Sequence, residues 1–141
     1  MRVTQSIVIA LAATAAVTAC ISSTAVDPAS QVHTAIRGFI VDQNGDGVGA
    51  PLVSITIVGS PSGGSAKLLA STQLVPDDAG RFVVTFSIND EVPQTGYAAL
   101  SVRPAPGTGL AGRDTTGIPV QLQRGFPPLD TTVVRIALPP R

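Results

Sequence analysis

The feature that most constrains this sequence is a two-residue alternation of apolar and polar side chains, which recurs in short runs along the chain. In the run 51–59 the large apolar residues Val53, Ile55 and Ile57 are separated by Ser54 and Thr56. Successive side chains of a β-strand point to opposite faces, so this period places one row of side chains in a core and the other on a surface. The run 81–88 repeats the pattern. Such runs predict β-strands and not helices.

Seven runs of this kind are separated by clusters rich in glycine, proline and aspartate, which favour turns. The expected strands are 34–42, 51–59, 67–75, 81–88, 97–103, 118–122 and 132–138. Pro119 cannot donate a hydrogen bond to a neighbouring strand, so the run 118–122 is expected at the edge of a sheet. We therefore predict an all-β, antiparallel sandwich of two sheets with about seven strands.

The charge balance and the cysteine content exclude several classes of function. Nine basic and nine acidic side chains give a net charge of zero, without the positive excess that would favour binding to nucleic acid or to an anionic bilayer. We therefore expect no nucleic-acid partner. The single cysteine, Cys20, cannot form a disulfide within the chain, so the fold needs no oxidative cross-link.

The first twenty residues differ from the rest of the chain. Arg2 is followed by an apolar run over residues 7–17. Eleven residues span about 16 Å as a helix, roughly half of the hydrocarbon core of a bilayer, so this run is too short for a transmembrane helix. A positive charge, a short apolar run and a small-residue cleavage site are the features of a secretory signal peptide.

Residues 17–20 (Val-Thr-Ala-Cys) resemble the bacterial lipobox. The resemblance implies that acyl chains such as palmitate are attached at Cys20 and that the signal peptide 1–19 is removed. Residues 20–31 would then form a flexible tether and residues 32–141 the sandwich domain. Ile21, in place of aspartate after the cysteine, implies transfer to the outer membrane if the organism has one. The alternative is an ordinary signal peptide cleaved after Ala19.

Three further segments resemble one known family. They are 36–42 (IRGFIVD), 48–57 (VGAPLVSITI) and 77–82 (DDAGRF). Together they are similar to the carboxypeptidase regulatory-like family of transthyretin-type sandwiches, which read roughly G-x-V-x-D, G, P-L-x-x-V-x-V and D-x-G-x-F. The resemblance covers residues 35–103. It implies an accessory module without chemistry of its own, of the kind found beside enzymes, transporters and adhesins.

One turn matches the first half of a calcium-binding loop. Asp42, Asn44 and Asp46 place oxygen atoms at loop positions 1, 3 and 5, and Gly47 occupies position 6. Position 12 is Val53 and not the glutamate that such loops use, and no helix is expected on either side. The alternative is a polar turn between two strands, where glycine after asparagine or aspartate is favoured.

Residues that could perform catalysis are sparse. His33 is the single histidine, no G-x-S-x-G motif is present, and the adjacent pair Asp77 and Asp78 precedes a glycine turn. A catalytic triad or a histidine-based metal site would have to use His33. We therefore predict that the protein is not an enzyme.

Two expected loops, 104–117 and 123–130, are long for so small a domain, and long loops often carry binding residues. Arg103, Arg113 and Arg124 lie in or beside them. These arginines form either a cationic rim for an anionic glycan or an ordinary solvated surface.

The sequence as a whole predicts a lipid-anchored, non-enzymatic module of the cell envelope with a binding or structural role. Its expected partners are the membrane, through the lipid at Cys20, and an envelope protein or a glycan. The alternative function is a calcium-dependent adhesion or carbohydrate-binding module that uses the 42–47 loop.

The substitution Cys20→Ser tests the predicted anchor, because the cysteine thiol is the atom to which the lipid is attached. We expect it to abolish incorporation of a fatty-acid probe and to release the protein from membranes, measured by metabolic labelling and fractionation. Labelling that persists in the variant would contradict the prediction.

Overall fold

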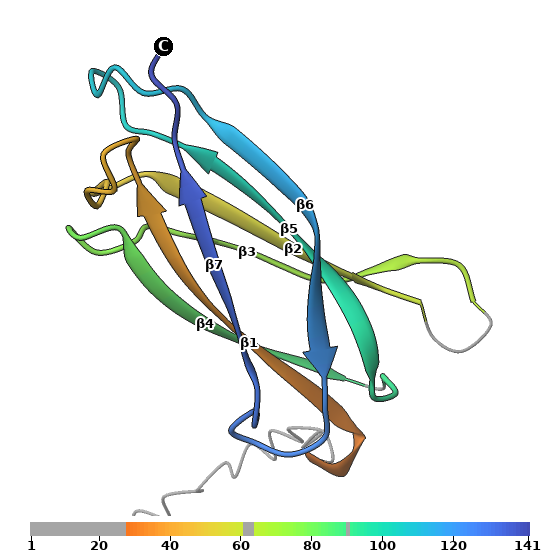
Figure 1. The fold of residues 1–141 in the computed structure, drawn as a ribbon. Coiled ribbons are helices and arrows are strands. Elements are labelled where there is room, and N and C mark those ends of the chain that lie inside the picture. Colours follow the sequence, from red (N-terminus) through yellow and green to blue (C-terminus); the bar gives the residue numbers. More distant parts are fainter. Residues whose placement is uncertain (1–27, 61–63, 90) are drawn as a thin grey trace, which may run out of the picture.

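The computed structural model describes residues 28–60, 64–89 and 91–141, and it arranges them in two β-sheets (Figure 1). A short 3-10 turn, Pro28–Ser30, precedes the strands. The strands are β1 (Gln31–Val41), β2 (Leu52–Gly59), β3 (Lys67–Leu74), β4 (Arg81–Asn89), β5 (Gln94–Arg103), β6 (Arg113–Leu122) and β7 (Thr131–Ala137). The three-stranded sheet has the order β4-β1-β7, and the four-stranded sheet has the order β3-β2-β5-β6. The predicted all-β sandwich of seven strands is confirmed. Cys20 and the predicted signal peptide lie outside the described residues.

The core is built by the rows of side chains that the alternation predicted to be inward. β2 contributes Val53, Ile55 and Ile57, all fully buried, and β1 contributes Ile36 and Ile40. Burying each such side chain stabilises the fold by about 1.5–3 kcal/mol. None of the described segments contains a helix long and apolar enough to cross a bilayer.

Close packing in the core requires a glycine on β1. Gly38 lies opposite Phe82 of β4, and a Cβ atom there would lie 2.0 Å from the Phe82 ring. The ring therefore covers the backbone of β1 directly.

The β6 strand is twice as long as predicted. It begins at Arg113, so the last five residues of the expected loop 104–117 belong to a strand, and this part of the prediction is wrong. The added residues are mostly exposed and polar, and a bulge between Ala98 and Leu100 of β5 shifts their register. They carry no apolar alternation to mark them in the sequence. The prediction that Pro119 lies in an edge strand is confirmed.

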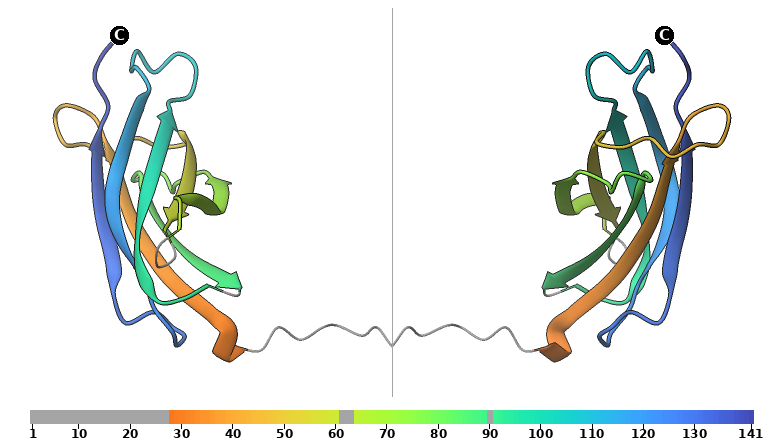
Figure 2. Two further views of the ribbon diagram at one scale, coloured as in Figure 1. Left: turned by 90° about the vertical axis from the view of Figure 1, so that its right-hand side faces the viewer. Right: turned by 90° about the vertical axis from the view of Figure 1, so that its left-hand side faces the viewer.

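One pairing is parallel, although the sequence predicted antiparallel strands throughout. β7 pairs with β1 from Ala35 opposite Thr131 to Val41 opposite Ala137. In Figure 1 both strands run toward the end of the sandwich at which the C-terminus lies, and the side views of Figure 2 show β1 (orange) crossing the length of the molecule. The direction follows from the 123–130 loop, which carries the chain from the four-stranded sheet back to the three-stranded one.

The turn after β1 and the turn before β4 have the same hydrogen-bond pattern. In each, the N–H of an aspartate, Asp42 or Asp77, donates to the carbonyl group four residues later, and the N–H of the glycine at the fourth position donates back to the aspartate carbonyl. The aspartate Oδ1 also accepts two backbone N–H groups, at 2.8–3.0 Å. The glycines, Gly45 and Gly80, have φ angles of 89° and 74°, a region that favours glycine.

The second of these turns packs against the end of β1 and against the segment that follows the first turn. The N–H of Ile40 donates to the carbonyl of Gly80 at 2.8 Å, and the N–H of Val48 donates to the carbonyl of Ile40 at 2.9 Å. A Cβ atom on Gly80 would lie 2.1 Å from the Ile40 carbonyl oxygen. Gly80 is therefore fixed both by its backbone angle and by its neighbours.

The substitution Gly80→Ala is expected to lower the free energy of unfolding by about 3 kcal/mol or more, because backbone strain and a steric clash add together. Gly107→Ala is the matched control, since Gly107 has a φ of 84° but no atom within 4 Å of an added Cβ. Strain alone should cost about 1 kcal/mol there. Urea unfolding measures both values, and equal losses would contradict the proposed contact.

Candidate functional site

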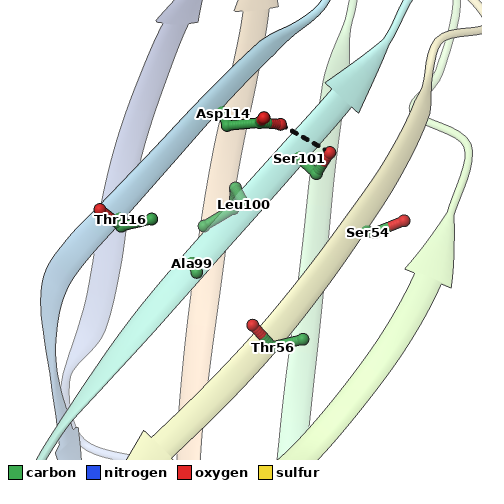
Figure 3. Close-up of a pocket in the computed structure, with 7 residues that line it drawn as sticks. All are labelled: Ser54, Thr56, Ala99, Leu100, Ser101, Asp114 and Thr116. Atoms are coloured by element: carbon green, nitrogen blue, oxygen red, sulfur yellow. Dashed lines mark hydrogen bonds between the residues drawn. The ribbon is translucent and has the colours of Figure 1, made fainter.

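The outward face of the four-stranded sheet is hollowed because its side chains are short. A depression of about 320 Å³ crosses β2, β5 and β6 (Figure 3). It is lined by Ser54, Thr56, Ala99, Leu100, Ser101, Asp114 and Thr116. A second depression of about 360 Å³ continues it between β2 and β3, where Ser71 and Gln73 line it. The two depressions form one surface, which we call the polar groove.

Strand register places four polar side chains in one row across this groove. Gln73 lies opposite Ser54, Ser54 lies opposite Ser101, and Ser101 lies opposite Asp114. Gln73 Nε2 donates to Ser54 Oγ at 3.1 Å, and Ser101 Oγ donates to Asp114 Oδ1 at 2.7 Å. Four adjacent strands span about 14 Å at the usual strand spacing. The row therefore presents hydroxyl, amide and carboxylate groups along a line perpendicular to the strands.

Asp114 is the charged group of the row. Arg103 donates to both of its carboxylate oxygens, at 2.9 and 3.3 Å. The hydrogen bonds from Arg103 and, to a smaller extent, from Ser101 hold the pKa of Asp114 below its ordinary value of 3.8. Asp114 is therefore ionised at neutral pH and provides a fixed acceptor at one end of the row.

An aromatic side chain flanks the groove nearer the start of β5. Tyr97, the only tyrosine of the chain, is half exposed. It pairs with Val58 on one side and with Pro119 on the other. The ring therefore adds an apolar surface on the same face of the sheet, four residues along β5 from Ser101.

The side chain of Asp42, the first residue of the predicted calcium loop, has a structural role in the turn. Asp42 Oδ1 accepts the backbone N–H groups of Asn44 and Asp46, at 2.8 and 2.9 Å. In the parts of the chain that the structure describes, no group of three or more histidine, cysteine, aspartate or glutamate residues is placed to hold a metal ion. Calcium binding at Asp42, Asn44 and Asp46 stays a prediction.

The residues considered for catalysis lie apart. His33, near the start of β1, is buried; its Nδ1 is 2.9 Å from Ser87 Oγ, and its ring packs edge-on against Phe126. Asp77 lies in the turn before β4, toward the other end of β1, where its carboxylate holds two backbone amides. The structure does not bring the two together.

The three arginines expected at a loop rim instead bind local partners. Arg103 pairs with Asp114, the Nη1 of Arg113 donates to the carbonyl of Ala137 at 3.0 Å, and that of Arg124 donates to the carbonyl of Ala29. Arg113 thereby links the two sheets, and Arg124 ties the 123–130 loop to the start of the domain. Their arrangement supports a structural role.

Sequence reasoning missed the polar groove. The sequence feature that could have indicated the groove is the small size of the outward residues in the alternating runs. These residues are serine, threonine or alanine, as at Ser54, Thr56, Ala99 and Ser101. Short side chains at consecutive outward positions of neighbouring strands leave a hollow. The order of the strands, needed to join these positions, is not readable from the runs themselves.

Comparison with known proteins indicates the fold alone. No protein-family model matches the sequence, and no curated protein matches it. The chain is similar to the crystal structure of chlorocatechol 1,2-dioxygenase from Pseudomonas putida, with a TM-score of 0.52 and 11% identity over 78% of this chain and 61% of that one. It is also similar to 3-chlorocatechol 1,2-dioxygenase from Rhodococcus opacus, with a TM-score of 0.49 and 12% identity over 77% and 60%. The chain thus spans about three-fifths of the length of either enzyme.

The substitution Arg103→Gln is expected to raise the pKa of Asp114 toward 3.8, because it removes the hydrogen bonds that favour the carboxylate. A depressed pKa contributes stability above the ordinary pKa, and that stability is lost as the pH falls through the depressed value. An NMR pH titration of the Asp114 carboxyl carbon measures the change. Arg113→Gln is the control and should leave this titration unchanged; an unchanged titration in Arg103→Gln would contradict the assignment.

Proposed function

We propose that this protein is a non-enzymatic, lipid-anchored module of the cell envelope that binds a glycan chain in the polar groove. The observation that carries the proposal is the row formed by Gln73, Ser54, Ser101 and Asp114 across four adjacent strands. The anchoring part rests on the lipobox-like residues 17–20. A single sandwich behind a short tether is a suitable form for a binding module held at a membrane.

The chemistry of the groove favours a hydroxyl-rich ligand. Small-molecule sites are concave and mostly apolar, and they bury most of the ligand. The polar groove is shallow, and most of its lining residues are serine or threonine, so it presents hydroxyl groups among apolar surface, with the carboxylate of Asp114 at one end. A sugar chain offers many hydroxyl groups that can pair with these donors and acceptors. Its apolar ring faces suit the exposed side chain of Tyr97.

We propose a non-enzymatic role because the aspartate and histidine side chains that could take part in catalysis form structural hydrogen bonds instead. Asp42 and Asp77 each hold two backbone amides of a turn. His33 is covered and hydrogen-bonded to Ser87. These side chains are engaged in holding the structure together, whereas the groove residues lie on a face that is open to a ligand.

The proposal is tested by an NMR titration of the protein with linear neutral hexasaccharides, namely chitohexaose, cellohexaose and maltohexaose. We expect one of them to shift backbone resonances of β2, β5 and β6 around the groove. Thr56→Leu should weaken this binding at least tenfold, because the larger side chain fills the depression. Thr85→Leu, on the outward face of β4, is the matched control and should bind like the unaltered chain.

Three results would contradict glycan binding in the groove. One is that none of the hexasaccharides binds. Another is that the shifts cluster in the 42–47 turn and not on the four-stranded sheet. The third is that Thr56→Leu and Thr85→Leu bind equally well.

A further inference from the structure

The outward face of the three-stranded sheet has a different chemistry from the polar groove. Strands β1, β4 and β7 together contain three arginines and no acidic residue. Arg37, Arg81 and Arg135 are all exposed on the outward face. Although the whole chain has a net charge of zero, this face carries a local excess of three positive charges.

Strand register gathers these arginines around one aromatic ring. Phe39 of β1 lies opposite Arg81 of β4 on one side and opposite Arg135 of β7 on the other. Arg37 lies two residues before Phe39 on the same face of β1. A depression of about 230 Å³ lies beside them, lined in part by Arg37, Phe39 and Arg81.

The three guanidinium groups have no partner among the described residues. Neither a side-chain hydrogen bond nor an ion pair joins Arg37, Arg81 or Arg135 to any of them, in contrast to Arg103, which pairs with Asp114. The nearest acidic residues along the chain are Asp42, Asp46, Asp77, Asp78 and Asp130, in the turns and the loop that border this sheet. The carboxylate of Asp130 accepts a hydrogen bond from Gln123 Nε2 at 3.2 Å. Arg135 Nη2 lies beside the 42–47 turn, 3.3 Å from the place that a Cβ atom on Gly45 would take. The Oδ1 atoms of Asp42 and Asp77 are occupied by backbone amides.

The same face also exposes apolar side chains. Val83 and Val133 lie on either side of Arg37, and they are 62% and 63% exposed. A soluble anion would use the arginines but would leave both valines in water. A lipid surface offers phosphate groups to guanidinium groups and an apolar boundary to the valines.

From this combination we propose that the outward face of the β4-β1-β7 sheet docks on an anionic lipid surface. Arg37, Arg81 and Arg135 contact lipid phosphates, and Val83 and Val133 enter the interface. The proposed anchor at Cys20 provides the biological setting, and the docking chemistry of the face is independent of it.

The chain length between Cys20 and the domain permits this arrangement. Pro28 follows Cys20 by eight positions, and eight positions span at most about 26–29 Å when the chain is extended. The face centred on Phe39 lies eight residues along β1 from Gln31, about 26 Å at the rise of a strand. The sandwich can therefore lie on its side against the lipid to which it is attached. The polar groove, on the opposite sheet, then points away from the membrane.

The expected strength suits a tethered domain. One arginine near an anionic surface raises partitioning roughly fivefold, so three raise it by about a hundredfold. That gain is modest for a free protein. For a domain already held at the surface, docking is an intramolecular step with a high effective concentration. The same hundredfold gain is then enough to keep the β4-β1-β7 face in contact with the lipid.

The experiment measures partitioning of the whole chain, carrying Cys20→Ser so that no lipid is attached, onto phosphatidylcholine vesicles with or without phosphatidylglycerol. Two triple variants are compared in this background. R37Q/R81Q/R135Q removes the basic face, and R103Q/R113Q/R124Q removes the same charge elsewhere. The signal peptide is present in every variant, so its contribution to partitioning cancels in the comparison. Urea unfolding confirms that each variant is folded.

We expect R37Q/R81Q/R135Q to lose about 50- to 100-fold of its partitioning onto the anionic vesicles at low salt. R103Q/R113Q/R124Q should stay within a fewfold of the reference. The difference should disappear on neutral vesicles and in high salt, where charges are screened. V83S/V133S, with all three arginines present, should lose partitioning severalfold.

Equal partitioning of the two triple variants would overturn the proposal. So would binding of soluble polyphosphate through Arg37, Arg81 and Arg135 without binding to vesicles, because the ligand would then be a free polyanion. Failure of lipid labelling at Cys20 would contradict the proposed anchor, but it would not change what the vesicle experiment says about docking of the β4-β1-β7 face. Loss of glycan binding would likewise bear only on the groove.

Discussion

The pairing of β1 with strands on both of its sides is the interaction on which the rest of the structure depends. β1 pairs with β4 over nine residues and with β7 over seven. These contacts join the start of the described chain to its end, so the three-stranded sheet is complete only when the last strand is in place. The two registers also decide which β1 side chains face the core and which face outward. Ile36 and Ile40 are thereby fixed inside, and Arg37 and Phe39 outside.

The strands were predictable because their signal is local. Alternation in runs such as 51–59 follows from the geometry of one strand packed on one face, and every predicted run is a strand in the structure. The first half of β6 was not predictable, because residues such as Arg113 and Asp114 lie in an edge strand and bury almost no apolar surface. The parallel pairing of β1 with β7 was also beyond the sequence, since periodicity does not say which strands become neighbours.

The candidate sites illustrate the same limit. Chemical reasoning from the sequence selected acidic residues in glycine-rich turns, and the structure shows that Asp42 and Asp77 hold the backbone of those turns. The polar groove instead consists of residues that are unremarkable one at a time. Ser54 and Ser101 form part of the proposed binding surface only because register places them side by side, with Asp114 next in the row. The net charge of zero has the same limit as a guide to binding. A total over the whole chain does not show that three arginines lie on the outward face of β1, β4 and β7 while the nearest acidic residues lie in turns and loops.

A sandwich of two sheets has two outward faces that point in opposite directions, and in this protein the two faces have different chemistry. The face with Arg37, Val83 and Val133 combines unpaired positive charge with exposed apolar surface. Leaving both in water brings no gain from ion pairing or burial, and an anionic lipid interface offers both. The other face carries Ser54 and Ser101, whose hydroxyl groups suit a hydrated ligand. Docking of the first face would turn the second toward the aqueous side. In the proposed arrangement the membrane would fix the orientation of the domain, and the polar groove would stay open to a glycan.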